Sequence, residues 1–389
     1  MRLLARGLAA AALLTAPFLT APSATARVPA PLHLAERAVP GQYIVTLHKN
    51  LDPSSFAQQS ALSPFFTYSK VFRGFAATLT ATQLDLVRNS PGVAAVEENA
   101  TVTAFGTGDA HRTNRGAAAS WGLDRIDQHL LPLDNQFTAT GTGKGATAYI
   151  VDTGIDYGHS EFGGRAVPGF DAIDDGRAGQ DCAGHGTHVA GTVGGATYGI
   201  ARQAALVSVR VLDCQGNGTL AGVIAGFDWV AGHAKQPAVL NASLGGDPSP
   251  ALNQAVGEVW DSGVLPVVAA GNDAKDACQV SPASADDAIA VGASDRDDKE
   301  AGFSNFGSCV SLFAPGKAIV SAKLGGGSIA MDGTSMASPH VAGVALLYTA
   351  ANPTATPAAV STWLTDQSTK NVLTVAQNTP DQLLFTGAL

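Results

Sequence analysis

Three short segments of the chain carry residue types that could together perform nucleophilic chemistry. They are Asp152 in AYIVDTGID, His185 in GHGTHVAG and Ser335 in DGTSMASPHVAG. A serine hydroxyl becomes an effective nucleophile when an imidazole accepts its proton, and a carboxylate must orient that imidazole and stabilise its cation. Each residue alone has a common structural explanation, as a turn residue, a glycine-flanked histidine or a helix N-cap. The three together predict an Asp-His-Ser catalytic triad.

The pair His185 and His188 in HGTH suggests a second hypothesis, a zinc hydrolase. Against it, the two histidines are three residues apart rather than four, no Glu follows the first, and no third ligand is evident. We therefore expect His188, and likewise His340, to be structural.

The segments around these residues predict an α/β fold. The apolar run 146–151 is typical of a strand buried on both faces of a parallel sheet, which places Asp152 at the carboxyl end, where open α/β sheets form their sites. Small residues after His185 predict a closely packed helix, and HVAGVALLYTA predicts another helix that follows Ser335. The positive end of that helix would favour negative charge near the serine. We expect a doubly wound domain with a mostly parallel sheet and helices on both faces.

From about Trp121 to near the C-terminus, the sequence resembles the subtilases. The stretches that carry the resemblance include RVLDCQGNGTLAGVIAGFDWV, NASLGG, AAGND and FSNFGSCVSLFAPG, and they are most similar to the proteinase K group and its aqualysin-type enzymes. The order Asp, His, Ser along the chain is the one known for subtilisin. The resemblance implies a secreted serine endopeptidase that acts through an acyl-enzyme. A catalytically inactive relative that serves as a binding or scaffold protein is the rival, and it is disfavoured because no catalytic position is substituted.

The resemblance also implies an oxyanion hole and a substrate cleft. Asn272 in AAGN matches the family's side-chain oxyanion donor, with the backbone N–H of Ser335 as its partner. An extended peptide would add a strand between two enzyme segments, so that its main chain is gripped largely independently of sequence. The positions that match this cleft and its primary pocket are Gly216, Gly218, Leu220, Ser243, Leu244, Gly245, Ala269, Ala270 and Gly271. Because the pocket residues are small and uncharged, we expect broad specificity with a preference for apolar or aromatic residues before the scissile bond.

The N-terminal third predicts a secreted precursor. Residues 1–26 have the layout of a signal peptide, with Arg2 and Arg6 before an apolar stretch that is too short to span a membrane. Residues 27–113 resemble an inhibitory propeptide that also aids folding, with a folded part at about 41–105. Within it, QYIVTL, GFAATLT and GVAAVEEN predict strands, and a capping box from Thr80 to Gln83 predicts a helix. By alignment with related mature enzymes, we expect self-cleavage near Thr113–Asn114, which leaves a peptidase domain at 114–389.

Charge limits the partners of that mature domain. Residues 114–389 contain fourteen Lys or Arg against twenty-six Asp or Glu, a formal net charge of −12. This acidity argues against nucleic acid as a partner. We expect a monomer whose partners are polypeptide substrates and its own propeptide, with no membrane contact after the signal is removed.

All four cysteines lie in the predicted peptidase domain. An even count in a secreted chain favours disulfides, and four cysteines allow three pairings. The resemblance to aqualysin-type enzymes selects Cys182 with Cys214 and Cys278 with Cys309.

Calcium is the one cofactor that the resemblance implies, as a structural ion. Asp124, Asp127 and Gln128 in WGLDRIDQ match a calcium site of the aqualysin branch, and carboxylate and amide oxygens suit this cation. A third family site, near Pro282, lacks its usual Asp because the chain has Ser311 there, so we expect no tight binding at that place.

A second acidic cluster stays open between a cation site and a solvated loop. Its members are Asp171, Asp174, Asp175 and Asp181.

Overall fold

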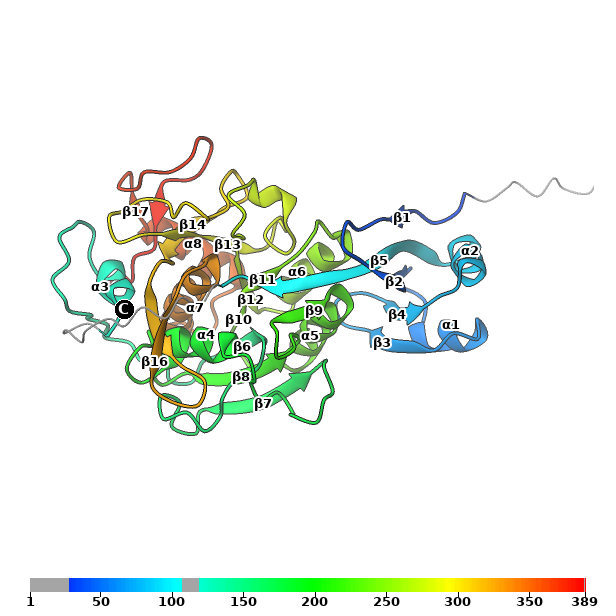
Figure 1. Cartoon of the computed structure of the whole chain (residues 1–389), viewed down its shortest axis with the longest axis horizontal. Helices are drawn as coiled ribbons and strands as arrows, with labels where there is room; N and C mark the ends of the chain where they lie inside the picture. Colours follow the sequence, from blue (N-terminus) through cyan, green and yellow to red (C-terminus); the bar gives the residue numbers. More distant parts are fainter. Residues whose placement is uncertain (1–27, 107–118, 388) are drawn as a thin grey trace, which may run out of the picture.

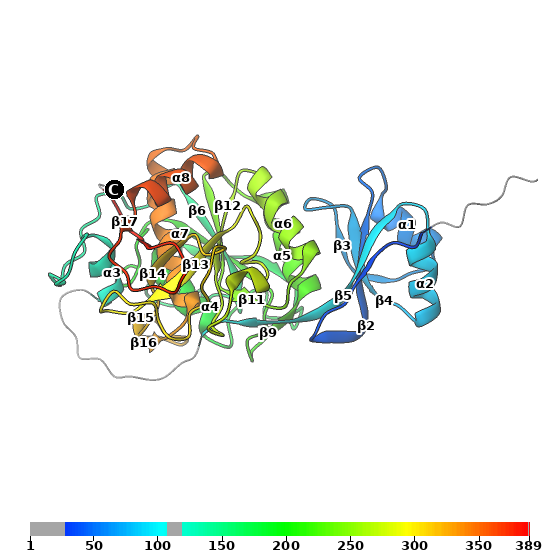
Figure 2. The ribbon, with the colours of Figure 1, turned by 90° about the horizontal axis from the view of Figure 1, so that it is seen from above.

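The computed structural model describes residues 28–106, 119–387 and 389. They form a small N-terminal module, residues 28–100, and a larger C-terminal module from residue 119 onward, as Figures 1 and 2 show. A short tail, residues 101–106, leads from the first into the second. The expected signal peptide and the expected cleavage site at Thr113–Asn114 lie outside the described residues.

The N-terminal module is an antiparallel sheet with two helices. The sheet order is β1-β5-β2-β4-β3, and only β1 pairs in parallel with its neighbour. The predicted capping box is confirmed, because Thr80 accepts from the Gln83 N–H and Gln83 accepts from the Thr80 N–H. The elements are β1 (Leu32–His33), β2 (Ala38–Leu47), α1 (Pro53–Gln59), β3 (Pro64–Tyr68), β4 (Gly74–Thr78), α2 (Ala81–Asn89) and β5 (Val93–Ala104).

A nine-stranded sheet runs through the described part of the C-terminal module. Its order is β17-β18-β14-β13-β12-β10-β6-β8-β7, and every neighbouring pair is parallel except β17 with β18. Strands β6, β10, β12 and β13 are buried along their whole length, which explains their nearly unbroken apolar sequences. The strands are β6 (Thr147–Asp152), β7 (Ala166–Asp171), β8 (Ala205–Arg210), β10 (Ala238–Ala242), β12 (Leu265–Ala269), β13 (Ile289–Ser294), β14 (Leu312–Pro315), β17 (Thr369–Lys370) and β18 (Gln382–Leu383).

Helices cover both faces of this sheet, which confirms the predicted fold class. Helices α4 and α7 pack together in one hydrophobic cluster, and α5 and α6 pack together in another. Two short strands, β9 and β11, and the hairpin β15–β16 lie outside the main sheet. No helix in the described residues is long and apolar enough to span a membrane. The remaining elements are α3 (Trp121–Ile126), α4 (His185–Gly194), β9 (Asn217–Thr219), α5 (Leu220–His233), β11 (Leu244–Gly245), α6 (Pro250–Asp261), η1 (Ala277–Gln279), β15 (Ile319–Ala322), β16 (Ser328–Met331), α7 (Thr334–Ala351) and α8 (Pro357–Gln367).

Helix α7 begins earlier than the sequence suggested. It starts at Thr334, so Ser335 lies in its first turn instead of before it, and Pro339 lies inside the helix. Proline has no N–H, so the helical bond to the carbonyl four residues earlier, that of Ser335, is missing. The Ser243 hydroxyl supplies it instead, because it donates to the Ser335 carbonyl at 3.0 Å.

The N-terminal module rests on the ends of α5 and α6. Asp228 in α5 accepts from the backbone N–H groups of residues 69, 70 and 71 at 2.6–3.0 Å. Glu97 and Asn99 of β5 accept from the first-turn N–H groups of Ala251 in α6 and Ala221 in α5 at 3.1 and 2.9 Å. Strand β5 then continues into the C-terminal module, where it pairs with β9 and β11 (Figure 1).

Candidate active site

Asp152 and His185 meet at the carboxyl end of β6. Asp152 is the last residue of this strand and His185 is the first residue of α4. The His185 Nδ1 lies 2.8 and 2.9 Å from the two Asp152 carboxylate oxygens, and both side chains are buried. Burial alone would lower the pKa of His185. The charge and hydrogen bond of Asp152, together with the charge of Asp181, outweigh burial and raise the pKa above its usual value.

The two neighbouring histidines, His188 and His340, each bind backbone carbonyl groups through one ring nitrogen. His188 Nε2 lies 3.0 and 3.2 Å from the carbonyl oxygens of Ile319 and Ile329, and His340 Nδ1 lies 2.8 Å from the Met336 carbonyl. Burial lowers the pKa of His188 to about 3 and that of His340 to about 4, so both are neutral at ordinary pH. Within the described residues, no group of three His, Cys, Asp or Glu side chains is placed to hold a metal ion.

Ser335 is held by Ser243 on two sides. The Ser335 hydroxyl donates to the Ser243 carbonyl at 2.9 Å, while the Ser243 hydroxyl donates to the Ser335 carbonyl. The Asn241 amide donates to the Ser243 hydroxyl at 2.9 Å and accepts from Ser338 at 2.8 Å, so this fully buried network fixes the start of α7 against the end of β10. His185 Nε2 is also buried, and it has no hydrogen-bond partner among the described residues.

Asn272 stands beside the start of α7. Its Oδ1 accepts from the backbone N–H and the hydroxyl of Thr334, at 2.9 and 2.8 Å, and this turns its Nδ2 away from Thr334. The N-cap is Gly333 (φ 150°), where a β-carbon would lie only 3.1 Å from that Nδ2. Ser335 is the second residue of the helix, so its backbone N–H has no intrahelical acceptor. The Asn272 Nδ2 and the Ser335 N–H are therefore both donors at the start of α7.

The tail occupies the expected substrate cleft as an added antiparallel strand. The Ala104 N–H donates to the Gly216 carbonyl at 3.0 Å, and the Phe105 N–H donates to the Ser243 carbonyl at 3.3 Å. Leu220 is 1% exposed and belongs to the same hydrophobic cluster as Val102 of the tail. The paired residues are Thr101 with Thr219, Val102 with Gly218, Thr103 with Asn217, Ala104 with Leu244 and Thr103 with Gly245.

The end of the tail lies against the residues that could do chemistry. The Phe105 ring is so near Gly245 that a β-carbon there would approach it to 2.5 Å. A β-carbon on Gly333 would lie 2.3 Å from the Phe105 carbonyl oxygen, the same position that is 3.1 Å from Asn272 Nδ2. A β-carbon on Gly106 would lie 3.0 Å from His185 Nε2. The peptide bond between Phe105 and Gly106 therefore spans the space between the Asn272 amide and the His185 imidazole.

The segment after β12 is fixed by a buried asparagine. Asn305 donates to the Ala270 carbonyl at 2.9 Å, and its backbone N–H donates to the Gly271 carbonyl. Gly271 has φ 109°, and a β-carbon there would lie 2.2 Å from Asn305 Nδ2, so only glycine fits. Ala269 ends β12 and is fully buried.

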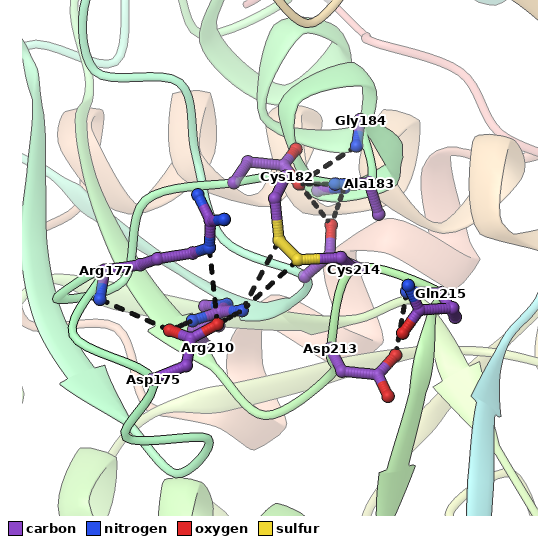
Figure 3. Close-up of a disulfide and its surroundings, with 12 residues drawn as sticks. Asp175, Arg177, Cys182, Ala183, Gly184, Arg210, Asp213, Cys214 and Gln215 are labelled. Carbon is purple, nitrogen blue, oxygen red and sulfur yellow. Dashed lines mark hydrogen bonds and ion pairs between the residues drawn. A yellow bond between two sulfur atoms is a disulfide. The ribbon is translucent and has the colours of Figure 1, made fainter.

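Two disulfides join the cysteines in the pairs that the resemblance implies, Cys182 with Cys214 and Cys278 with Cys309. Figure 3 shows the first, with the buried Arg210 beside it. Arg210 Nη2 lies 3.4 Å from the Cys182 sulfur, and the guanidinium donates to both oxygens of Asp175 at 2.6 and 2.9 Å. These bonds lower the pKa of Asp175 to about 2.

The second acidic cluster divides into separate roles. Asp171 and Asp175 pair with Arg210, Asp174 is an exposed turn residue with φ 54°, and Asp181 binds the start of α4. Residues 174–178 form an exposed loop, and the buried Arg210 of β8 supplies positive charge to Asp171 and Asp175.

The residues proposed for calcium lie together around the end of α3. Asp124 accepts from the backbone N–H groups of Asp134 and Asn135, and Asp127 accepts from that of Thr138. Burial, and then the charges of Asp124 and Asp134, raise the pKa of Asp127. Burial and mutual repulsion both disfavour the charged form of these carboxylates. A hard divalent cation between them would counter both effects, so the residues fit such an ion.

Ser311 is engaged elsewhere. Its hydroxyl accepts from the Ala290 N–H at 3.1 Å and its own N–H donates to the Ala290 carbonyl, so it serves the junction of β13 and β14.

Sequence reasoning missed the tail residues Phe105 and Gly106 and the supporting residues Thr334, Asn241 and Asn305. Phe105 had a usable signal, because an aromatic residue at the end of the predicted propeptide matches the expected primary pocket. The three supporting residues had none, since each is held by a partner that lies 35 to 97 residues away in the sequence.

Comparison with known proteins assigns both modules. Residues 143–384 match the subtilase family, and residues 42–105 match the peptidase inhibitor I9 family. An extracellular serine proteinase of a Thermus species is 45% identical over 380 residues, which cover 90% of this chain and 91% of the relative. An alkaline serine exoprotease A of Vibrio alginolyticus is 43% identical over 380 residues, which cover 92% of this chain and 70% of the relative.

A solved structure agrees with these matches. The crystal structure of a cold adapted subtilisin-like serine proteinase superposes with a TM-score of 0.68 at 50% identity, and it covers 68% of this chain and 97% of its own. The chain carries an I9 inhibitor propeptide before its peptidase domain, and it belongs to the subtilase family of serine proteinases.

Proposed function

We propose that the protein is a secreted endopeptidase that uses Asp152, His185 and Ser335 as its catalytic triad and Asn272 as its oxyanion donor. The observation that carries this proposal is the placement of the Phe105–Gly106 peptide bond, whose carbonyl oxygen lies toward the Asn272 amide while Gly106 lies against His185. A polypeptide in this position presents its carbonyl to the nucleophile and its nitrogen to the acid that must protonate it.

The reaction would proceed in two halves. His185 Nε2 accepts the Ser335 proton while the Ser335 oxygen attacks the carbonyl carbon, and the oxyanion is stabilised by Asn272 Nδ2 and the Ser335 N–H. His185 then gives its proton to the departing amine, which leaves an acyl-enzyme. Water repeats the sequence in the second half and releases the acid. Asp152 accepts the hydrogen bond from the His185 Nδ1–H throughout and stabilises the imidazolium.

The hydrogen bond from Ser335 to Ser243 defines a resting state. For attack, the Ser335 side chain must rotate from the Ser243 carbonyl toward His185 Nε2, which is buried and unpaired among the described residues. This needs only a change of one side-chain torsion, since the backbone of Ser335 is already fixed by the Ser243 hydroxyl.

Specificity would follow the contacts of the tail. Phe105 before the scissile bond and the buried Val102 three residues earlier favour substrates with an aromatic residue at the first position before that bond and an aliphatic residue at the fourth. Main-chain pairing with β9 and β11 would contribute binding that is independent of sequence, so specificity stays broad.

The same geometry supports a first self-cleavage site at Phe105–Gly106. This bond lies eight residues before the expected cleavage at Thr113–Asn114. We therefore place the first cut at Phe105–Gly106 and treat a cut near Thr113–Asn114 as later trimming. Residues 1–26 remain assigned to a signal peptide, residues 27–113 to a propeptide and residues 114–389 to the peptidase domain.

Calcium would have a structural role, with Asp124, Asp127 and Gln128 as its ligands and backbone carbonyls completing the shell. It would link the end of α3 to the loop that follows, far from the reacting atoms. We expect the mature enzyme to be an extracellular monomer.

Incubation of purified protein with casein tests the proposal. We expect hydrolysis that a serine-directed phosphonylating reagent abolishes, with the label on Ser335. Intact casein after verified removal of the propeptide would instead support the inactive scaffold. Replacement of Phe105 by Asp should slow the first cut, whereas Phe65→Asp, at an exposed propeptide position outside the tail, should not. N-terminal sequencing of the released fragment gives the position of the cut.

A further inference from the structure

The helix that carries His185 begins without a side-chain cap of its own. Its N-cap is Gly184, with φ 97°, and this residue can offer no oxygen from a side chain. The first N–H groups of a helix have no acceptors within the helix and must find them elsewhere. Because His185 is the first residue of α4, whatever binds these groups also determines where its imidazole lies.

Asp181 supplies the missing cap from outside the helix. It is 4% exposed, and its carboxylate accepts five hydrogen bonds. Oδ1 accepts from the N–H groups of Ala183 and Gly184 and from the Thr153 hydroxyl, each at 2.9 Å. Oδ2 accepts from the N–H and hydroxyl of Thr187 at 2.9 and 2.6 Å. Both oxygens are fully committed, so neither can be replaced by an NH2 group without a clash of donors.

Thr153 connects this cap to the strand that carries Asp152. Its N–H donates to Asp152 Oδ1 at 2.7 Å, and its hydroxyl donates to Asp181 while accepting from the Gly186 N–H at 2.9 Å. One buried hydroxyl thus joins the carboxylate of β6 to the first turn of α4.

The contact between these elements is too close for any other residue at position 186. A β-carbon on Gly186 would lie 2.1 Å from the Gly154 carbonyl oxygen and 3.1 Å from Asp152 Oδ1. The neighbouring Cys182–Cys214 disulfide fixes the segment that carries Asp181 to the loop before β9 (Figure 3).

We infer that Asp181 and Thr153 are positioning residues, which hold the first turn of α4 so that the His185 imidazole stays aligned between Asp152 and the reacting hydroxyl. The inference rests on the proposed role of His185 as general base. Neither residue touches the substrate position, so both act through His185.

Asp181 also adds a negative charge near the imidazole. This charge contributes to the raised pKa of His185, after the larger effects of burial, which lowers it, and of Asp152, which raises it. Among the neighbours of His185, the two buried histidines are neutral. The titratable or charged side chains on α4 and on the described elements packed against it are His188, Tyr149, Asp152, Arg210, His340 and Tyr348.

The sign of the expected pH effect follows from the charge. A general base must be neutral, so kcat/KM rises with pH through the pKa of His185 in the free enzyme. Removing the Asp181 charge lowers that pKa, which moves the acidic limb of the profile to lower pH. Loosening the first turn of α4 also lowers kcat, because a misplacement of about 1 Å can cost about 10²-fold.

The test measures pH profiles of kcat and KM on a small chromogenic peptide, with active sites counted by phosphonylation. For Asp181→Asn we expect kcat to fall about 10- to 100-fold, with little change in KM, and the acidic limb to move to lower pH. Thr187→Val keeps the Asp181 charge and loses two hydrogen bonds, the one to Asp181 and the one from the Asp156 N–H. It should lower kcat less and leave the acidic limb in place. Thr153→Val should lower kcat, and Thr153→Ser should restore it.

Ser208→Ala is the matched control, because its buried hydroxyl donates to the Gly179 carbonyl in the same loop but does not contact α4. The inference is overturned if Asp181→Asn keeps both the kcat and the acidic limb of the parent's pH profile. It is also overturned if the acidic limb of this variant does not move and its loss in kcat is no greater than that of Ser208→Ala. If Asp181→Asn does not accumulate folded, the Thr153→Val and Thr153→Ser pair decides, and equal kcat for the two overturns it. An inactive parent would refute the proposed function itself, separately from this inference.

Discussion

The two faces of the central sheet are held in different ways. On the face of α4 and α7, the helix starts are bound by residues of the peptidase domain, Asp181 for α4 and Ser243 for α7. On the face of α5 and α6, residues of both domains bind the helix starts. The N-cap residue of each helix accepts from the N–H of the third helical residue, and a propeptide side chain accepts from the N–H of the second.

The hydrophobic clusters repeat this difference. Among the described residues, the cluster of α4 and α7 contains no propeptide side chain, whereas the cluster of α5 and α6 includes Ile44, Tyr68, Val71 and Phe72. The catalytic face is complete within the peptidase domain, and the other face is completed by the propeptide. We therefore expect the propeptide to aid folding through α5 and α6 and to inhibit through its tail, and these two roles should be separable.

The largest effect should come from Ser335→Ala. Loss of the nucleophile should reduce turnover by about 10⁶-fold, the loss measured for subtilisin, which is a relative of this protein. The variant should accumulate as an uncut precursor in a protease-free expression system, seen by mass spectrometry of the purified protein. Its propeptide should stay bound, because no contact on α5 or α6 has changed. Normal processing of this variant would contradict self-cleavage.

Asn272→Ala should have the next largest effect on the catalytic face. Removal of one oxyanion donor costs about 10²- to 10³-fold in kcat in subtilisin. We expect a similar loss with KM nearly unchanged, measured on the same chromogenic peptide. Thr334→Ser, which keeps the hydroxyl that orients the Asn272 amide, is the control. A raised KM with an unchanged kcat would show that Asn272 binds the substrate but is not an oxyanion donor.

The two disulfides should separate stability from activity. They close loops of 32 and 31 residues, for which the chain-entropy model gives about 3–4 kcal/mol each. Double serine variants of either pair should therefore lose similar thermal stability. Only the loss of Cys182–Cys214 should also lower kcat, because this bridge borders Asp181. Peptide mapping that joined Cys182 to Cys278 would overturn both pairs.

Much of the catalytic face could be predicted from the sequence because its signals are local. Asp152 ends an apolar strand, and His185 opens a helix of small residues. In the propeptide, the capping box from Thr80 to Gln83 is an equally local signal. The start of α7 was misplaced because Pro339 is a helix breaker in isolation. Its missing bond is replaced by Ser243, 92 residues earlier, and no local pattern reveals that.

The contacts between the propeptide and the helices α5 and α6 could not be predicted from the sequence for the same reason. Glu97 and Asn99 are ordinary strand residues until β5 is placed over the starts of α6 and α5. Alignment to mature enzymes predicts a cut near Thr113–Asn114 because it reports where relatives begin, and it carries no information on which bond first lies in the cleft. The register of β5 against β9 and β11 is what brings Phe105 to the proposed catalytic residues.

Smaller effects should follow from the helix caps that the propeptide supplies. Loss of one cap costs about 1 kcal/mol, or about fivefold in an equilibrium constant. Glu97→Ala and Asn99→Ala should each raise the inhibition constant of the isolated propeptide about fivefold, and their effects should multiply because they bind different helices.

Glu98→Ala is the matched control for these caps, since Glu98 accepts from the Ala35 N–H inside the propeptide. It should leave inhibition of the parent peptidase domain nearly unchanged. If Glu98→Ala weakened inhibition as much as Glu97→Ala, loss of propeptide stability would be the cause, and the comparison of the two faces would fail.

Calcium should change stability and not turnover, and it should act on the face of α4 and α7 alone. Leu123 and Ile126 of α3 belong to the cluster of α4 and α7, so an ion at Asp124, Asp127 and Gln128 would stabilise that cluster. A ligand that binds only the folded state stabilises it by about 2.7 kcal/mol at a hundredfold excess over its Kd, which corresponds to several degrees in the unfolding midpoint of a domain of this size. Asp127→Asn should blunt the calcium-dependent rise in calorimetry and leave propeptide affinity unchanged. Ser311→Asp, which adds a carboxylate at the third family site, should not diminish the rise. If calcium raised the midpoint equally in the parent and in a double Asn variant at Asp124 and Asp127, the main site would lie elsewhere and α3 would have no part in it.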